Sequence, residues 1–125
     1  MKKIFVVGFG YVGKAMVNML KDHYEVHVYD PAHMPGLKNN VMFHSSIDDS
    51  DCVLSIICVP TPRSEDGSCD ISIVEDSLKQ LSARAILIKS TIEIGTTDTL
   101  THLYKRNIVF SPEYIGESKY YQPYY

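Results

Sequence analysis

The sequence predicts an α/β protein whose core is a doubly wound parallel sheet of about six strands in one domain. Three observations predict it. Short and almost wholly apolar runs alternate along the chain with segments whose apolar residues recur at helical spacing. Strands that are apolar on both faces are typical of a parallel sheet covered by helices on each side. The first run also passes directly into a glycine-rich turn and a helix-forming segment.

The N-terminal part supplies the first three predicted strands. Ile4–Gly8 (IFVVG) is unbroken and apolar, Glu25–Asp30 (EVHVYD) is the second strand, and Val41–His44 is a short third one. Between the first two strands, Val12–Leu20 predicts a helix, because its apolar residues follow helical spacing at Val12, Ala15, Met16, Met19 and Leu20.

The C-terminal part continues the alternation. Cys52–Val59 (CVLSIICV) predicts a strongly buried strand, which Pro60-Thr61-Pro62 ends. Ala85–Lys89 (AILIK) and Asn107–Phe110 (NIVF) predict the last two strands, and Thr96–Lys105 predicts the helix between them.

A further helix is predicted between the fourth and fifth strands. Its apolar positions are Ile71, Val74, Leu78 and Leu81. We expect Ser72 and Glu75 to form a capping box at its start, because a hydroxyl followed three residues later by a glutamate satisfies two unpaired amides.

Composition excludes several function classes. The net charge is −3, from 12 basic and 15 acidic residues, and no basic cluster is present. A nucleic-acid or anionic-membrane surface needs a concentrated positive field, so neither partner is expected. No apolar run approaches the ~20 residues of a membrane span. Met1-Lys2-Lys3 is followed by too short an apolar stretch for a secretory signal, and a cytoplasmic location is therefore expected.

The three cysteines do not predict a disulfide framework or a metal site. They are odd in number and lack metal-type spacing. Cys52 and Cys58 flank or lie in an apolar strand, so buried and unreactive thiols are the expectation. No metal is expected.

The glycine turn is the first candidate site. Gly8, Gly10 and Gly13 match the pattern G-x-G-x-x-G between a strand and a helix, which is the context of a Rossmann-type dinucleotide site. Gly8 permits the tight turn, Gly10 lets a pyrophosphate approach the backbone, and Gly13 lets the helix pack closely on the strand. The helix N-terminus then attracts the phosphates. A purely structural turn is the alternative.

Asp30 extends this site. It ends the second predicted strand, at the position where a carboxylate accepts hydrogen bonds from the adenosine ribose. Because a carboxylate there would repel a 2′-phosphate, NAD is expected in preference to NADP. A solvated acid at a strand end is the alternative interpretation.

Three other segments follow predicted strands: 59-VPTP-62, 89-KSTIEIGTT-97 and 111-SPEYIGES-118. Together with GFGYVG, they resemble the N-terminal NAD-binding domain of the UDP-glucose/GDP-mannose dehydrogenase family. The resemblance covers nearly the whole chain. It implies a nucleotide-sugar 6-dehydrogenase of the UDP-glucose to UDP-glucuronate type, which oxidises the sugar twice with NAD.

The resemblance also implies roles for particular residues. Thr91 would lie near the nicotinamide and a water, and Glu113 would support water activation or thioester hydrolysis. Glu117 would help to hold the sugar nucleotide. Thr61 and Thr91 could instead cap turns, and Glu113 could be a solvated loop acid. The expected cofactor-binding residues are Gly8, Gly10, Tyr11, Val12, Gly13, Asp30, Val59, Pro60, Thr61, Ser90 and Thr91.

The sequence departs from the family pattern in two respects. The family's nucleophilic cysteine, central helix and substrate-binding domain have no counterpart in residues 1–125, and Cys69 lacks the flanking residues of that nucleophile. The segment between Asp30 and Cys52 is short, so we expect one helix of the fold to be missing there.

These departures shape the expected function. We expect an NAD-binding domain that is inactive alone, with a homodimer or a separate substrate-binding domain as possible partners. A stand-alone regulatory NAD-binding module is the alternative. Another NAD(P) oxidoreductase of related fold is less compatible with the V-P-T-P and S-P-E segments.

Overall fold

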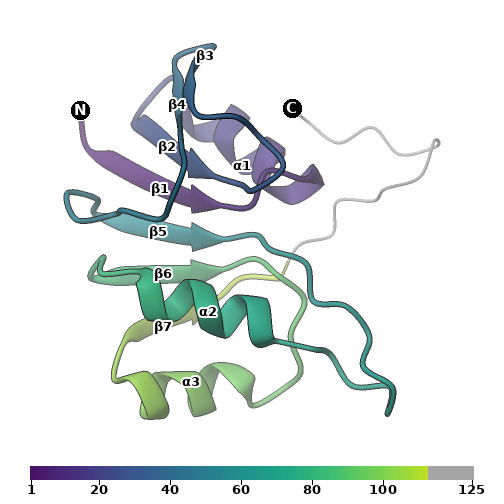
Figure 1. Ribbon diagram of the computed structural model, residues 1–125. Coiled ribbons are helices and arrows are strands. Elements are labelled where there is room, and N and C mark those ends of the chain that lie inside the picture. Colours follow the sequence, from purple (N-terminus) through teal and green to yellow (C-terminus); the bar gives the residue numbers. More distant parts are fainter. Residues whose placement is uncertain (113–125) are drawn as a thin grey trace.

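A computed structural model describes residues 1–112 of the chain, and these residues form one sheet with three helices (Figure 1). The helices are α1 (Tyr11–Leu20), α2 (Ser72–Gln80) and α3 (Thr96–Tyr104). The strands are β1 (Lys3–Val7), β2 (Glu25–Tyr29), β3 (Gly36–Lys38), β4 (Val41–His44), β5 (Leu54–Ile57), β6 (Ala85–Ile88) and β7 (Asn107–Phe110). None of these helices is long and apolar enough to cross a membrane.

The strand order is β3-β4-β2-β1-β5-β6-β7, and every pairing is parallel except the one between β3 and β4. Apart from the β3 edge, this is the order of a dinucleotide-binding doubly wound sheet. The chain leaves β1 towards β2 on one side and later returns to β5 on the other side of β1. The carboxyl ends of β1 and β5 therefore form the switch point at which ligands bind in such sheets.

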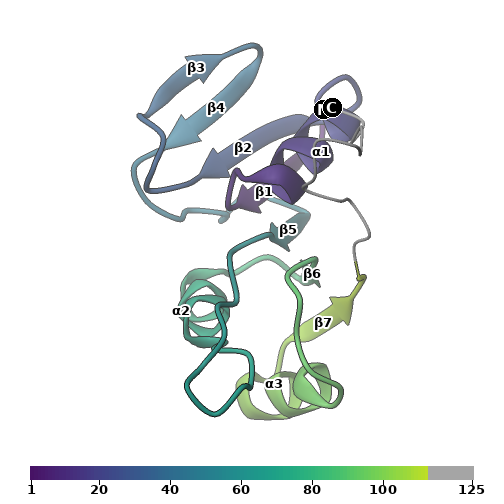
Figure 2. The same cartoon turned by 90° about the vertical axis from the view of Figure 1, so that its right-hand side faces the viewer.

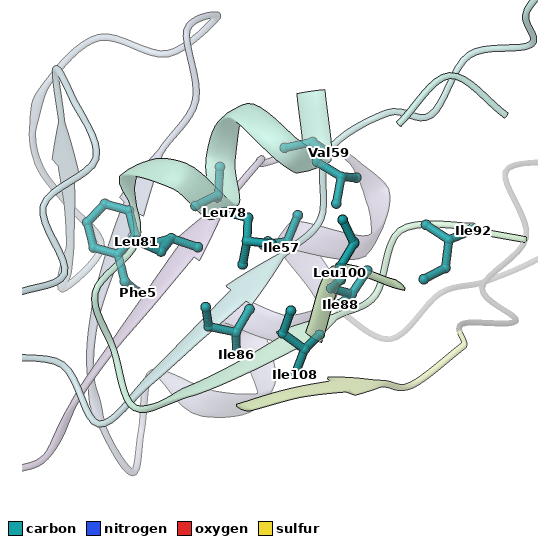
Figure 3. Close-up of a cluster of buried hydrophobic side chains, with 12 residues drawn as sticks. Phe5, Ile57, Val59, Leu78, Leu81, Ile86, Ile88, Ile92, Leu100 and Ile108 are labelled. Carbon is teal, nitrogen blue, oxygen red and sulfur yellow. The ribbon is translucent and has the colours of Figure 1, made fainter. Parts of the chain in front are cut away.

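Helices cover both faces of the sheet, with α1 on one face and α2 and α3 on the other (Figure 2). Consecutive residues of β1 belong to different clusters, because successive side chains of a strand point to opposite faces. Ile4 and Val6 pack with α1, whereas Phe5 and Val7 belong to the cluster beneath α2 and α3. Figure 3 shows that second cluster, in which Leu78 of α2 and Leu100 of α3 lie over the strand residues. The doubly wound α/β prediction is confirmed.

The sheet has one more strand than expected, because Gly36–Lys38 pairs antiparallel with β4. Asn39 and Asn40 connect these two strands with φ values of 49° and 65°, a left-handed conformation that asparagine tolerates well in tight hairpins. This hairpin occupies the connection from β2 to β4, and residues 30–40 contain no helix. As expected, the shortened connection contains no helix in the described structure.

The capping-box prediction for α2 is wrong. No side chain at the N-cap position bonds to the helix, and Asp70 Oδ1 accepts the Ser72 amide at 2.9 Å instead. The Glu75 carboxylate bonds to the hydroxyl of Tyr104 in α3 at 2.8 Å. A tertiary contact therefore replaces the local bond that the sequence pattern indicated.

The loop between β4 and β5 is held by a buried carboxylate. Asp49 is 1% exposed and accepts the Ser55 hydroxyl at 2.6 Å, the Ser82 amide and hydroxyl at 2.8 Å each, and the Ala83 amide at 2.8 Å. Burial works to raise the pKa of Asp49, but these hydrogen bonds outweigh it and keep the pKa below its ordinary value. Asp49 thus fastens a helix-free connection to the loop that precedes β6.

Candidate functional site

A cavity of about 460 Å³ lies at the carboxyl ends of β1, β5 and β6. Three separate turns contribute its walls: the glycine turn, the segment after β5 and the segment after β6. Its lining residues are Gly8, Phe9, Gly10, Tyr11, Val12, Asp30, Cys58, Val59, Pro60, Thr61, Lys89, Ser90 and Thr91. Ten of the eleven residues expected at the cofactor are therefore brought together, the exception being Gly13.

The three glycines lie in different environments. Gly8 has a φ of +98°, and an added Cβ would collide with the carbonyl oxygen of Cys58. An added Cβ at Gly13 would collide with the carbonyl oxygen of Gly8, so Gly13 sets the close approach of helix and strand. At Gly10 an added Cβ would meet no atom of the described residues within 4 Å. Protein packing therefore explains Gly8 and Gly13, and the open space at Gly10 suits a bound group.

The N-terminus of α1 faces this open space. The helix begins at Tyr11, and its N-cap residue, Gly10, has no side chain that could cap the first amides. No acidic residue lies in the first turn. The first amides of a helix lack carbonyl partners in the helix itself, and its dipole is positive at this end. Such a terminus binds anions, and a pyrophosphate is the anion that a glycine turn of this shape accommodates.

Asp30 lies beside the glycine turn. Its Oδ2 accepts the Phe9 amide at 2.7 Å and its Oδ1 accepts the Ala32 amide at 2.8 Å. Each carboxylate oxygen has a second lone pair that can accept another hydrogen bond. The two amides orient the carboxylate at the rim of the cavity, where it can accept hydrogen bonds from the hydroxyl groups of a ribose.

A second cavity, of about 360 Å³, continues the first on the α2 side of the sheet. Gly8, Asp30, Val59 and Pro60 line both cavities. Ile47, from the loop after β4, and Ile73, from α2, add apolar walls, and Asp76 and Gln80 of α2 add polar groups. A flat and largely apolar ring fits such a slot, so the two cavities together have the character of a dinucleotide cleft.

The segments after β5 and β6 are held together at the cavity. The buried Ser90 hydroxyl donates to the Val59 carbonyl at 2.7 Å, so its role is to fix the two turns to each other. Thr91 is exposed and Thr61 is half-buried. Both hydroxyls thus lie on turns whose backbone is already fixed.

Lys89, directly after β6, contacts the segment after β7. Its Nζ donates to the Ser111 hydroxyl at 3.1 Å.

Two expected site residues lie outside the part of the chain that the structure describes. Glu113 and Glu117 lie beyond residue 112, so their predicted roles remain predictions. Cys52, Cys58 and Cys69 form no disulfide among residues 1–112 and are half-buried. Burial, followed by the nearby Asp49 carboxylate, raises the pKa of the Cys52 thiol to about 11, which makes it a poor nucleophile. No His, Cys, Asp or Glu cluster suited to a metal occurs among the described residues.

Comparison with known proteins identifies the family. The model of the NAD binding domain of the UDP-glucose/GDP-mannose dehydrogenase family matches residues 27–124. The chain belongs to this family. The matched range begins after the glycine turn, so the assignment of Gly8–Gly13 rests on their own spacing and geometry. NAD is therefore the cofactor class of this domain.

Two curated relatives support the family assignment. A UDP-N-acetyl-D-mannosamine dehydrogenase of Methanococcus maripaludis is 30% identical over 140 residues, covering 86% of this chain and 32% of that protein. A UDP-glucose 6-dehydrogenase of Streptococcus pneumoniae is 30% identical over 146 residues, covering 94% and 37%. The chain therefore spans about a third of the length of these dehydrogenases.

Solved structures show the same fold. A UDP-glucose dehydrogenase from Pyrobaculum islandicum superposes with a TM-score of 0.73 at 22% identity, covering 94% of this chain and 37% of that one. A GDP-mannose dehydrogenase from Pseudomonas aeruginosa gives a TM-score of 0.68 at 19% identity, covering 92% and 37%. Both likenesses show the fold of the chain.

Sequence reasoning missed several residues that line the two cavities. Phe9, Cys58 and Lys89 line the first cavity, and each directly adjoins a motif residue, so adjacency was a usable signal. Ile47, Ile73 and Gln80 line the second cavity from a loop and a helix whose sequences carry no motif. Only the packing of α2 and of the loop after β4 against the sheet brings them to this cavity.

Proposed function

We propose that this chain holds NAD⁺ across both cavities and presents its nicotinamide end to a nucleotide sugar that is oxidised at C6. The pyrophosphate would lie on Gly10 and the α1 N-terminus, and the adenosine ribose would bond to Asp30. The adenine would enter the apolar slot beside Ile73. When bound, NAD⁺ supplies the hydride acceptor of the reaction.

The observation that carries this proposal is the one continuous cleft that joins Gly10, Asp30 and Thr91. The cleft runs along the carboxyl ends of β1 and β5, the switch point of the sheet, where dinucleotides bind in this architecture. Its three parts suit the three parts of NAD: an uncapped helix end for the pyrophosphate, a carboxylate for the ribose and an apolar slot for the adenine.

Thr91 is proposed to orient a water or the sugar at the reacting end of the cleft. A hydroxyl can both donate and accept a hydrogen bond, and Ser90 fixes the backbone that carries it. Glu113 is proposed to take a proton from that water, and Glu117 is proposed to contact the sugar nucleotide. The nucleophilic cysteine of the family has no counterpart in residues 1–125, so complete turnover needs groups from elsewhere.

Isothermal titration with NAD⁺ and NADP⁺ tests the cofactor part of the proposal. We expect saturable NAD⁺ binding that is at least tenfold tighter than NADP⁺ binding, because a 2′-phosphate would face the Asp30 carboxylate. Absence of NAD⁺ binding, or equal affinity for the two, would contradict it.

The catalytic part needs a separate test, since a regulatory NAD-binding module would bind the cofactor equally well. NADH absorbance would be followed with UDP-glucose, UDP-N-acetylmannosamine and GDP-mannose. We expect no turnover by residues 1–125 alone. Turnover restored by adding the substrate-binding part of a family member would support the dehydrogenase role, and its failure with every sugar would favour the regulatory module.

A further inference from the structure

A third cavity, of about 300 Å³, shares none of its described lining residues with the second cavity. It is bounded by α1 and by the β3–β4 hairpin. Among residues 1–112, only Phe9 lines both this cavity and the cofactor cleft. We call it the hairpin pocket. No part of the proposed NAD⁺ position uses it.

The hairpin pocket exists because the connection from β2 to β4 contains no helix. A crossover between parallel neighbours is right-handed, so a helix in this connection would pack beside α1 on the same face of the sheet. The chain forms the β3–β4 hairpin at the sheet edge instead. Val41 and Phe43 of β4 consequently form an apolar floor next to α1, and no helix of the described part of the chain lies above them.

The floor continues into a group of aromatic rings. The Phe9 and Phe43 rings meet edge to face with centroids 5.0 Å apart, and His33 contacts both, at 5.0 Å from Phe9 and 5.7 Å from Phe43. Flat ring systems prefer such edge and offset contacts. The floor therefore suits a ligand with a planar ring.

The rim of the pocket is cationic. Lys14 lies in α1, Lys21 directly follows that helix, and Lys38 comes from β3. No carboxylate is among the described residues that line the pocket. Within residues 1–112 none of these lysines forms an ion pair, and Lys14 and Lys38 lie over the Phe9 and Phe43 rings at 5.8 and 5.0 Å. Three ammonium groups gather here although the whole chain carries a net charge of −3. Asn18 and Asn39 add amide donors.

We propose that the hairpin pocket binds a small organic anion that combines a planar ring with a phosphate group. The ring lies on Phe9 and Phe43, and the phosphate is held by Lys21 and Lys38. A cavity of this volume matches a small molecule of nucleotide size and is too small for a protein segment. Because Phe9 also holds Asp30 through its amide, the ligand lies directly beside the adenosine end of the cofactor cleft.

The experiment is a titration of the 15N-labelled 125-residue chain with 1-naphthyl phosphate, followed by amide chemical shifts. Inorganic phosphate and 1-naphthol are the comparison ligands, since each offers one half of the proposed chemistry. We expect saturable shifts at Val17, Lys21, Lys38 and Phe43, with naphthyl phosphate binding at least threefold tighter than either half. The proposal is independent of NAD⁺ binding, because the cofactor amides Gly10 and Val12 report separately in the same spectra.

Two double variants make the test specific. Lys21→Gln/Lys38→Gln removes the proposed phosphate contacts, and Lys2→Gln/Lys79→Gln removes the same charge from exposed sites outside the pocket. We expect the first to weaken naphthyl phosphate binding at least fivefold and the second to change it less than twofold. Equal effects of the two variants would overturn the proposal. So would shifts confined to the cofactor amides, or no saturable shift at the four pocket positions.

Discussion

The amide of Phe9, between the first two glycines of the turn, donates a 2.7 Å hydrogen bond to Asp30 Oδ2 across 21 residues of sequence. This bond joins the part of the site that would hold the pyrophosphate to the part that would hold the ribose. Because Ala32 binds the other carboxylate oxygen, the orientation of Asp30 is set by the backbone on both sides.

Asp30→Asn should weaken NAD⁺ binding by about tenfold, which corresponds to ~1.4 kcal/mol. The amide side chain loses the charge that strengthens its hydrogen bonds, and its NH2 group would face one of the two backbone donors. Titration calorimetry measures the change, and Asp22→Asn in an exposed turn is the matched control. The preference for NAD⁺ over NADP⁺ should also shrink. An unchanged preference would mean that Asp30 does not face the ribose.

Gly10→Ala should leave the fold intact and reduce NAD⁺ affinity by tenfold or more. Its added methyl meets no protein atom within 4 Å but enters the space proposed for the pyrophosphate. Gly13→Ala is the informative comparison, because its methyl would collide with the carbonyl of Gly8 and should lower the thermal midpoint. Thermal unfolding and NAD⁺ titration of both variants separate the two roles. A Gly10→Ala protein that binds NAD⁺ normally would contradict the proposed cofactor position.

Asp49→Ala should destabilise the protein by roughly 3 kcal/mol or more, because buried hydroxyl and amide donors lose their only charged acceptor. Urea unfolding measures the loss. Asp48→Ala is the neighbouring control, since within the described residues the Asp48 side chain hydrogen-bonds only to the exposed Ser50. A loss of less than 1 kcal/mol would show that the loop is held by other contacts.

The lowered pKa of Asp49 also predicts an acid dependence of stability. A carboxylate whose pKa is lower in the folded state stabilises the fold above its ordinary value of 3.8, and this stability is lost as pH falls further towards the folded pKa. The urea midpoint of the native chain should therefore fall more steeply below about pH 4 than that of Asp49→Asn. If the urea midpoints of the native chain and of Asp49→Asn fall with pH at the same slope, Asp49 does not carry the acid dependence.

His44 predicts a second pH dependence. Burial, and then the neighbouring His27, lowers the pKa of His44 from its ordinary value of 6.5, while Asp48 acts in the opposite direction. His44 Nε2 lies 2.7 Å from His27 Nδ1, and His27 Nε2 lies 2.7 Å from Glu25 Oε2. The unfolded chain therefore takes up the proton of residue 44 more readily than the folded protein, and stability should decrease as pH falls below 6.5.

His44→Gln should flatten this dependence between pH 7 and 5, since glutamine can still bond to His27 but does not titrate. Thermal midpoints at intervals across this range measure it. His23→Gln, at an exposed position, serves as the control. If the native chain and His44→Gln respond alike to pH, the His27–His44 pair does not carry the effect.

The order of elements was predictable from sequence because it depends on local patterns. Runs such as IFVVG and CVLSIICV can be buried on both faces only in a parallel sheet, and their alternation with helical periodicity leaves few topologies. The glycine turn was predictable for the same reason, since Gly8 needs a left-handed φ that its local backbone imposes. The family motifs at the ends of β5 and β6 followed from their position after those strands.

Tertiary structure decided the features that depend on contacts between distant segments. The Glu75–Tyr104 bond and the Asp49 network each add a partner that local spacing does not specify. The hairpin pocket arises only because β4 lies beside α1 without a covering helix. Sequence by itself determined which backbone shapes the chain can form, and the packed sheet determined which side chains share a cavity, because burial and hydrogen-bond distance are properties of the folded chain.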